Sequence, residues 1–200
     1  DDAAACLKRF RTHDFNEAVA LGDDLHATFL EAGHILGAAS IVLNTAKTTI
    51  AFSGDLGRYD NPIMHDPTPI LEADYLLVES TYGDTVHPAT DPEDILEDVI
   101  NRTFQRGGSV IIPSFAVGRT QEILYILADL VRRGRISPLK VYVDSPMANE
   151  ATRITLAHDD LLDAETRELI AWQQAHPEKM RVEFVADVER SKELNAMREG

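Results

Sequence analysis

The middle of the chain alternates between helix-forming and strand-forming stretches, and no other feature of the sequence restricts the fold as strongly. Asp91 supplies an N-cap, and the amphipathic stretch after it ends before Gly107. A strand over residues 110–112, a second helix ending at Gly134 and a strand over residues 139–143 are expected next. Strands that alternate with helices are joined by right-handed crossovers and lie in a parallel sheet, so this region is predicted to have an α/β fold.

The region before it has a different pattern, in which short β-rich runs alternate with glycine-containing turns. We expect strands over residues 27–30, 40–43 and 48–52, which would form a mostly antiparallel sheet. A further short, buried strand is expected over residues 76–78. Because the composition changes near residues 85–91, from sheet-rich and acidic to α/β, a domain boundary is predicted there.

The last part of the chain predicts a helix over residues 161–174, a strand over residues 181–185 and the start of a helix at residues 191–197. No apolar stretch approaches the roughly 20 residues that cross a bilayer, so we expect no membrane contact and a cytoplasmic protein. The chain begins with Asp rather than Met, which leads us to expect a fragment of a longer protein.

A single cysteine, Cys6, excludes an intrachain disulfide framework and any cysteine-based zinc finger. Its alanine- and leucine-containing surroundings predict a small apolar side chain in a helix. Any metal must therefore be held by histidines and carboxylates.

The formal charge of -15 argues against a general nucleic-acid coat, because binding to phosphates depends on clustered Lys and Arg. The charge is uneven, however: residues 101–140 hold 7 basic and 2 acidic residues. A polyanion would be expected to dock near this segment. The alternative, a solvated helix face, stays open.

Two polar residues lie directly after predicted strands, each between glycines. His34 lies between Gly33 and Gly37, and Asp55 lies between Gly54 and Gly57. Glycine lets the backbone bring a side chain to a crowded point without a Cβ clash, as a metal ligand requires. Taken singly, His34 could be a loop histidine and Asp55 a turn residue.

Five consecutive blocks of the sequence resemble the β-CASP metallo-β-lactamase proteins. These blocks are residues 31–39 (EAGHILGAA), 52–57 (FSGDLG), 73–83 (ADYLLVESTYG), 108–122 (GSVIIPSFAVGRTQE) and 141–148 (VYVDSPMA). The resemblance implies a partial metallo-β-lactamase-type sheet region over residues 1–88, followed by part of a β-CASP α/β parallel-sheet region over residues 89–200. It also implies a metal-dependent ribonuclease in which two zinc ions activate water to cut RNA.

The resemblance assigns roles to individual residues. His34 matches a metal-ligand histidine, and Asp55 matches the carboxylate that bridges both zincs and takes part in catalysis. Glu79 matches the acidic residue of the first β-CASP motif, which the resemblance implies to be catalytic and to support the metal site from the neighbouring strand end. Two metals about 3.5–4 Å apart can lower the pKa of a shared water and clamp both oxygens of an in-line displacement.

Two strand-to-helix turns are expected to contact the substrate. Free backbone N–H groups and a guanidinium in such a turn suit a phosphate, and open α/β sheets bind ligands at this edge. The residues concerned are Ser114, Phe115, Gly118, Arg119, Asp144 and Ser145. Two alternatives stay open: a surface ion pair of Arg119 with Glu122, and a helix cap at Asp144 and Ser145.

The chain departs from the family in two respects. The His-x-His-x-Asp-His cluster that supplies most metal ligands is absent from the sequence, and so are the two later β-CASP histidine motifs. His34 and Asp55 cannot hold a tight dinuclear zinc site alone. We therefore expect the chain by itself to be inactive and to bind zinc weakly.

Three functions are compatible with these features. The favoured one is an RNA endo- or exonuclease, with single-stranded DNA as the less favoured substrate and a homodimer as an open alternative to a monomer. A noncatalytic RNA-binding or scaffold protein of the same fold is the alternative. A small-molecule metallohydrolase ranks last, because it does not explain the helix–strand alternation after Asp91.

Overall fold

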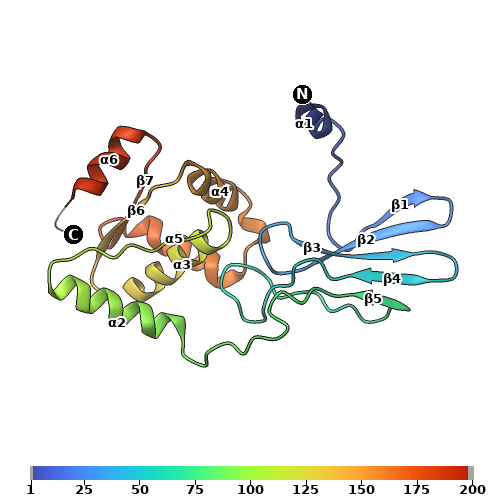
Figure 1. Ribbon diagram of the computed structural model, residues 1–200, viewed down its shortest axis with the longest axis horizontal. Coiled ribbons are helices and arrows are strands. Elements are labelled where there is room, and N and C mark those ends of the chain that lie inside the picture. Colours follow the sequence, from blue (N-terminus) through green and yellow to red (C-terminus); the bar gives the residue numbers. More distant parts are fainter. Residues whose placement is uncertain (1, 198–200) are drawn as a thin grey trace. The chain divides into compact units, whose positions relative to one another are not determined.

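The computed structural model describes residues 2–197, which divide into two compact units (Figure 1). The first unit takes in Asp1–Asn61 and Asp66–Gly83, and the second takes in Pro62–His65 and Asp84–Gly200. Each unit contains its own sheet, five-stranded in the first and two-stranded in the second.

The first unit is built on a sheet with the strand order β1-β2-β3-β4-β5. The strands are β1 (Ala18–Gly22), β2 (Leu25–Glu31), β3 (Ala39–Asn44), β4 (Thr49–Phe52) and β5 (Tyr75–Leu77). The first four are antiparallel and β5 runs parallel to β4, which confirms the mostly antiparallel sheet. The pattern does not predict β1, because only Val19 of its residues is even half-buried.

The prediction of a buried strand over residues 76–78 is wrong in its burial. A strand forms there as β5, but its side chains are 53–64% exposed. β5 is the edge strand of its sheet and is hydrogen-bonded to β4 alone among the described strands. An apolar run predicts burial only when a neighbouring layer covers it, and this strand has no such cover within its unit.

The second unit opens with the helices α2 (Pro92–Gln105) and α3 (Arg119–Arg132), both at the predicted places. The carboxylate of Asp91 accepts a hydrogen bond of 2.9 Å from the backbone N–H of Glu93, which confirms the predicted N-cap. Gly107, with a φ of 69°, follows the C-cap of α2. Glycine is the preferred residue at a position with positive φ just beyond the end of a helix.

The predicted strand over residues 110–112 is wrong. This segment has no regular secondary structure, and Ile111 is 89% exposed. A strand requires a neighbouring strand to accept and donate its backbone hydrogen bonds, and none of the described strands pairs with this segment.

The second unit does contain a parallel pairing, as an α/β region requires, but it joins β6 (Leu139–Val143) to β7 (Met180–Phe184) rather than to residues 110–112. The connection between them holds α4 (Pro146–Ala157), the 3-10 helix η1 (Asp159–Leu161) and α5 (Ala164–Ala175). Helix α6 (Val188–Ala196) follows β7. The pattern predicts α5, β7 and α6 with bounds that differ by one to three residues, but it does not predict α4.

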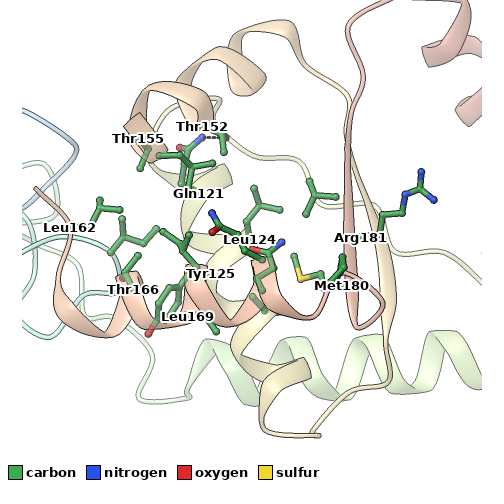
Figure 2. Close-up of a pocket in the computed structure, with 18 of the residues that line it drawn as sticks. Gln121, Leu124, Tyr125, Thr152, Thr155, Leu162, Thr166, Leu169, Met180 and Arg181 are labelled. Carbon is green, nitrogen blue, oxygen red and sulfur yellow. Dashed lines mark hydrogen bonds between the residues drawn. The ribbon is translucent and has the colours of Figure 1, made fainter. Parts of the chain in front are cut away.

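Buried side chains of α2, α3, α5 and β7 form the core of the second unit, with Leu130 fully buried and Ile100, Leu169 and Met180 at 2% exposure. A cavity of about 660 Å³, lined mainly by apolar side chains, lies beside this core (Figure 2). On its wall, the amide Nε2 of Gln121 donates a 2.8 Å hydrogen bond to the hydroxyl of Thr152, which joins α3 to α4.

Helix α1 (Asp2–Leu7) carries Cys6. The helix is confirmed, but the thiol side chain is exposed rather than packed. Within residues 2–197, none of the helices is both long enough and apolar enough to cross a bilayer.

Candidate functional site

The topology of the first sheet brings three sequence-predicted residues to the same end. Glu31 at the end of β2 pairs with Ala39 at the start of β3, and β3 is antiparallel to β4. The end of β4 pairs in turn with the end of the parallel strand β5. The segments that carry His34, Asp55 and Glu79 all begin at this end of the sheet.

The His34 turn, defined here as residues 32–38, is a compact loop between β2 and β3. It is closed by a hydrogen bond of 3.0 Å from the N–H of Ala32 to the carbonyl of Ala38. Gly33 and Gly37 have φ values of 66° and 81°, which favour glycine over other residues. The imidazole-bearing residue itself is exposed.

The Asp55 turn, defined here as residues 54–57, follows β4. Gly54 has a φ of 59°, and a Cβ atom at this position would lie 2.7 Å from the carbonyl oxygen of Ala39. Only glycine allows this approach. Asp55 is exposed, and among the described residues no hydrogen bond or ion pair engages its carboxylate.

The two turns are in direct contact. The N–H of Gly57 donates a 2.8 Å hydrogen bond to the carbonyl of Ala32. A Cβ atom at Gly57 would lie 1.9 Å from the carbonyl oxygen of Gly33 and 2.9 Å from the backbone nitrogen of His34. The backbones that carry His34 and Asp55 are therefore packed against each other.

Glu79 holds the Asp55 turn from the other side. Its Oε1 accepts a 2.7 Å hydrogen bond from the N–H of Leu56, and its Oε2 accepts one of 3.3 Å from the N–H of Thr81. A hydrogen bond from the Thr81 side chain, the same two backbone N–H groups and the nearby charge of His34 lower the pKa of Glu79 below 4.5. The carboxylate is therefore ionised at neutral pH.

The described residues do not form a complete zinc site. A tetrahedral zinc needs four ligands, and within residues 2–197 no group of three or more His, Cys, Asp or Glu side chains could hold a metal. Both carboxylate oxygens of Glu79 already accept N–H groups. Exposed His34 and Asp55 are the ligand types that zinc accepts, and they would supply two of the positions.

The predicted substrate turn before α3 is exposed. Phe115 is 84% exposed, and the Ser114 hydroxyl donates a 3.4 Å hydrogen bond to the carbonyl of Ile112. Gly118, with a φ of 80°, is the N-cap of α3 and provides no side-chain cap. The guanidinium of Arg119 is 2.7 Å from the carboxylate of Glu122, which is the surface ion pair of the alternative interpretation.

In the second predicted substrate turn, after β6, both Asp144 and Ser145 are hydrogen-bonded to other residues of the same unit. Ser145 is the N-cap of α4, and its hydroxyl accepts a 3.2 Å hydrogen bond from the N–H of Ala148. Asp144 accepts a 2.8 Å hydrogen bond from the hydroxyl of Ser191 in α6. These contacts match the helix-cap alternative, while both residues do lie at the carboxyl end of a parallel strand.

The basic segment over residues 101–140 is largely neutralised within the second unit. Arg135 forms ion pairs with Glu93, Asp94 and Glu97 of α2, and Arg133 pairs with Glu93 and Asp129. The remaining pairs are Arg102–Asp98, Arg119–Glu122, Arg132–Asp129 and Lys140–Glu183. The guanidinium of Arg106 contacts the Thr103 hydroxyl instead. This arrangement favours the solvated helix face over a docking surface for a polyanion.

The sequence interpretation did not identify Ser40 or Ser53, which are 1% and 3% exposed. They are hydrogen-bonded to each other, and Ser53 directly precedes the Asp55 turn. In the sequence, the only indication of their role is their position. Ser53 stands at a strand end just before Gly54, and Ser40 lies in the neighbouring strand β3. A serine in a strand does not by itself predict burial.

Comparison with known proteins finds one domain family and several similar proteins. A Beta-Casp domain model matches residues 120–200. Ribonuclease TTHA0252 of Thermus thermophilus is 37% identical over 149 residues, which is 74% of this chain and 34% of that protein. Transcription termination factor FttA of Methanosarcina mazei is 35% identical over 183 residues, 87% of this chain and 28% of that protein.

Endoribonuclease YSH1 of Eremothecium gossypii is also similar, with 30% identity over 186 residues, 88% of this chain and 24% of that protein. The chain thus spans about a third or less of the length of these relatives. The chain belongs to the β-CASP family of metallo-β-lactamase-fold proteins.

Proposed function

We propose that the chain is part of a zinc-dependent phosphodiester hydrolase that cleaves RNA. The observation that carries this proposal is the packing of the His34 turn against the Asp55 turn, at the sheet end that also holds Glu79. An imidazole and an unengaged carboxylate on adjacent turns suit shared metal coordination. The names of the relatives, which include a ribonuclease and an endoribonuclease, support RNA as the substrate.

In this proposal the chain combines parts of two domains. Residues 1–88 are the C-terminal part of a metallo-β-lactamase-like domain, which carries the metal-ligand turns. Residues 89–200 are the N-terminal part of a β-CASP domain, which contacts the RNA. The Beta-Casp match over residues 120–200 supports the second assignment.

The residues of this chain would have separate tasks. His34 and Asp55 would supply two ligands to zinc, whose chemistry is to activate water and neutralise charge on the phosphate. Glu79 keeps the Asp55 turn in place through Leu56. In the second unit, Phe115 and the N-terminal turns of α3 and α4 would contact the RNA, and Arg119 would reach a phosphate after exchanging its partner Glu122.

The 200-residue chain alone is expected to be inactive. Its described residues supply too few metal ligands for a tight site, since Glu79 is occupied by backbone N–H groups. Isothermal titration with Zn²⁺ checks this expectation. Weak binding is predicted, and tight binding of two zincs per chain would contradict it.

A noncatalytic RNA-binding or scaffold protein is the second candidate. The incomplete donor set within residues 2–197 favours it, since a fold that keeps its turns but lacks ligands cannot activate water. One similar protein is named a transcription termination factor rather than a nuclease.

A cleavage assay separates the two candidates. Labelled RNA and labelled single-stranded DNA of the same sequence are incubated with the protein in its full natural length and, in parallel, with this chain alone. Each reaction is run with and without a chelator. The proposal predicts RNA cleavage that the chelator abolishes, by the longer protein only; RNA binding without cleavage would establish the scaffold.

A further inference from the structure

Ser53 takes part in four hydrogen bonds at the end of the first sheet. It follows β4 directly and is 3% exposed. Its N–H donates a 2.9 Å hydrogen bond to the carbonyl of Leu77 at the end of β5. Its carbonyl accepts a 2.6 Å hydrogen bond from the hydroxyl of Ser40 in β3. The main chain of Ser53 thus joins the ends of three strands.

The Ser53 hydroxyl has both a donor and an acceptor role. It accepts a 2.9 Å hydrogen bond from the N–H of Glu79 and donates one of 2.7 Å to the carbonyl of Gly54. The first bond spans 26 residues, and the second fixes the peptide that leads into Asp55. A single oxygen atom therefore connects the Glu79 strand end to the Asp55 turn.

The backbone on both sides of Asp55 is held in this way. Before it, Gly54 is held by Ser53; after it, Leu56 is held by Glu79 and Gly57 by Ala32. The Asp55 carboxylate is exposed and makes no hydrogen bond to any described residue. A fixed main chain with an unengaged side chain is the arrangement that a preorganised ligand needs, because little ordering entropy remains to be lost on binding.

We propose that Ser53 is a positioning residue, whose hydroxyl sets the Asp55 turn against the strand end that carries Glu79 and so aims the Asp55 carboxylate. The inference rests on the proposed function where it treats Asp55 as a metal ligand. The geometry of the turn does not depend on that function. Ser53 acts through Asp55 and contacts neither metal nor RNA.

Removal of the hydroxyl has a local consequence. In Ser53→Ala the N–H of Glu79 loses its acceptor and the carbonyl of Gly54 loses its donor, while the main-chain bonds to Leu77 and Ser40 remain. The strands therefore stay paired, and the loosening is confined to the turn. Ser53→Thr retains the hydroxyl and serves as the conservative variant.

Amide hydrogen exchange on the 200-residue chain tests the proposal at residue level. In Ser53→Ala the amides of Glu79 and Leu56 are expected to exchange at least about 10-fold faster. The amides that pair β3 with β4, at Leu43 and Ile50 for example, are expected to be unchanged. Ser53→Thr is expected to restore slow exchange. Ser137→Ala, which alters an exposed serine in the second unit, is the matched control.

Two results would overturn the proposal: unchanged exchange at Glu79 and Leu56, or an equal acceleration throughout β3 and β4, which would make Ser53 a general structural residue. If the extra methyl group of Ser53→Thr unfolds the chain, the test still stands. It then depends on Ser53→Ala alone, in which exchange at Glu79 and Leu56 is compared with exchange throughout the sheet.

A kinetic comparison adds a readout that mere structural support would not produce. In the protein of full natural length, Ser53→Ala is expected to lower kcat for RNA by roughly 10-fold or more with KM nearly unchanged, since the proposed RNA contacts lie elsewhere. A rise in KM alone would contradict the positioning role. If exchange responds as expected but the unaltered protein cleaves no RNA, the proposed function fails while the role of Ser53 in the turn holds.

Discussion

The carbonyl oxygen of Gly33 lies so close to Gly57 that a Cβ atom on Gly57 would be 1.9 Å away from it. This approach joins the turn that carries His34 to the turn that carries Asp55. The Gly33 carbonyl and the Gly57 backbone that it approaches both belong to the main chain, so neither can rotate away as a side chain could. The proximity of the two proposed ligands is thus built into the backbone.

Gly57→Ala is expected to force these turns apart. The added methyl group overlaps the Gly33 carbonyl, and overpacking of this kind costs about 1–3 kcal/mol. Urea unfolding of the chain measures the loss. Gly22→Ala is the control, because a Cβ atom there meets nothing within 4 Å. Equal stability of the two variants would show that the turns do not pack as described.

Leu130→Ala is expected to destabilise the second unit by about 2–5 kcal/mol, because Leu130 is fully buried in its core. Ile111→Ala is the matched control: Ile111 is 89% exposed, and its change should stay within about 0.5 kcal/mol. Chemical unfolding followed by the fluorescence of Trp172, which packs against this core, provides the measurement. A large loss in Ile111→Ala would place that segment in a packed strand after all.

Arg135→Ala is expected to loosen α2, since Arg135 forms ion pairs with Glu93, Asp94 and Glu97 of that helix. The melting temperature should fall, and the fall should shrink in 1 M salt because ions screen charges at a partly exposed surface. Arg106→Ala controls for the loss of an arginine that forms no ion pair among the described residues. A loss that does not change with salt would argue against this electrostatic role.

Glu183 is expected to titrate far below an ordinary glutamate. Hydrogen bonds from Arg190 and then Lys140 lower its pKa from 4.5 to about 2. Because the folded pKa is depressed, the stability that these contacts provide is complete above pH 4.5 and is lost as the pH falls through about 2. A carboxyl NMR titration locates the midpoint, and a midpoint near 4.5 would show that the ion pairs do not persist in solution.

Local signals explain why much of the fold could be predicted from the sequence. The N-cap Asp91 and the glycine at position 107 act within a few residues, so α2 follows from the sequence itself. The strand expected over residues 110–112 failed because a strand also depends on a partner, which the sequence of the segment does not specify. The burial of β5 could not be predicted for a similar reason, since burial depends on a covering layer that the sequence of the strand does not specify.

The candidate site could be predicted in part for a similar reason. His34 and Asp55 stand out because each lies between glycines after a strand. Ser53 does not, because its hydroxyl bonds to Glu79 across 26 residues, and such a contact exists only in the folded sheet. The identity of Arg119 likewise gave no indication of whether its guanidinium pairs with Glu122 or remains available.

The most direct test of the central claim is an NMR titration of the chain with Zn²⁺ that follows the His34 imidazole and the Asp55 carboxylate together. The two signals are predicted to shift in parallel with one weak apparent affinity, and Asp55→Ala is predicted to abolish the response of His34. A His34 response that is unchanged in Asp55→Ala, or no response from either residue while other histidines shift, would contradict the shared metal site.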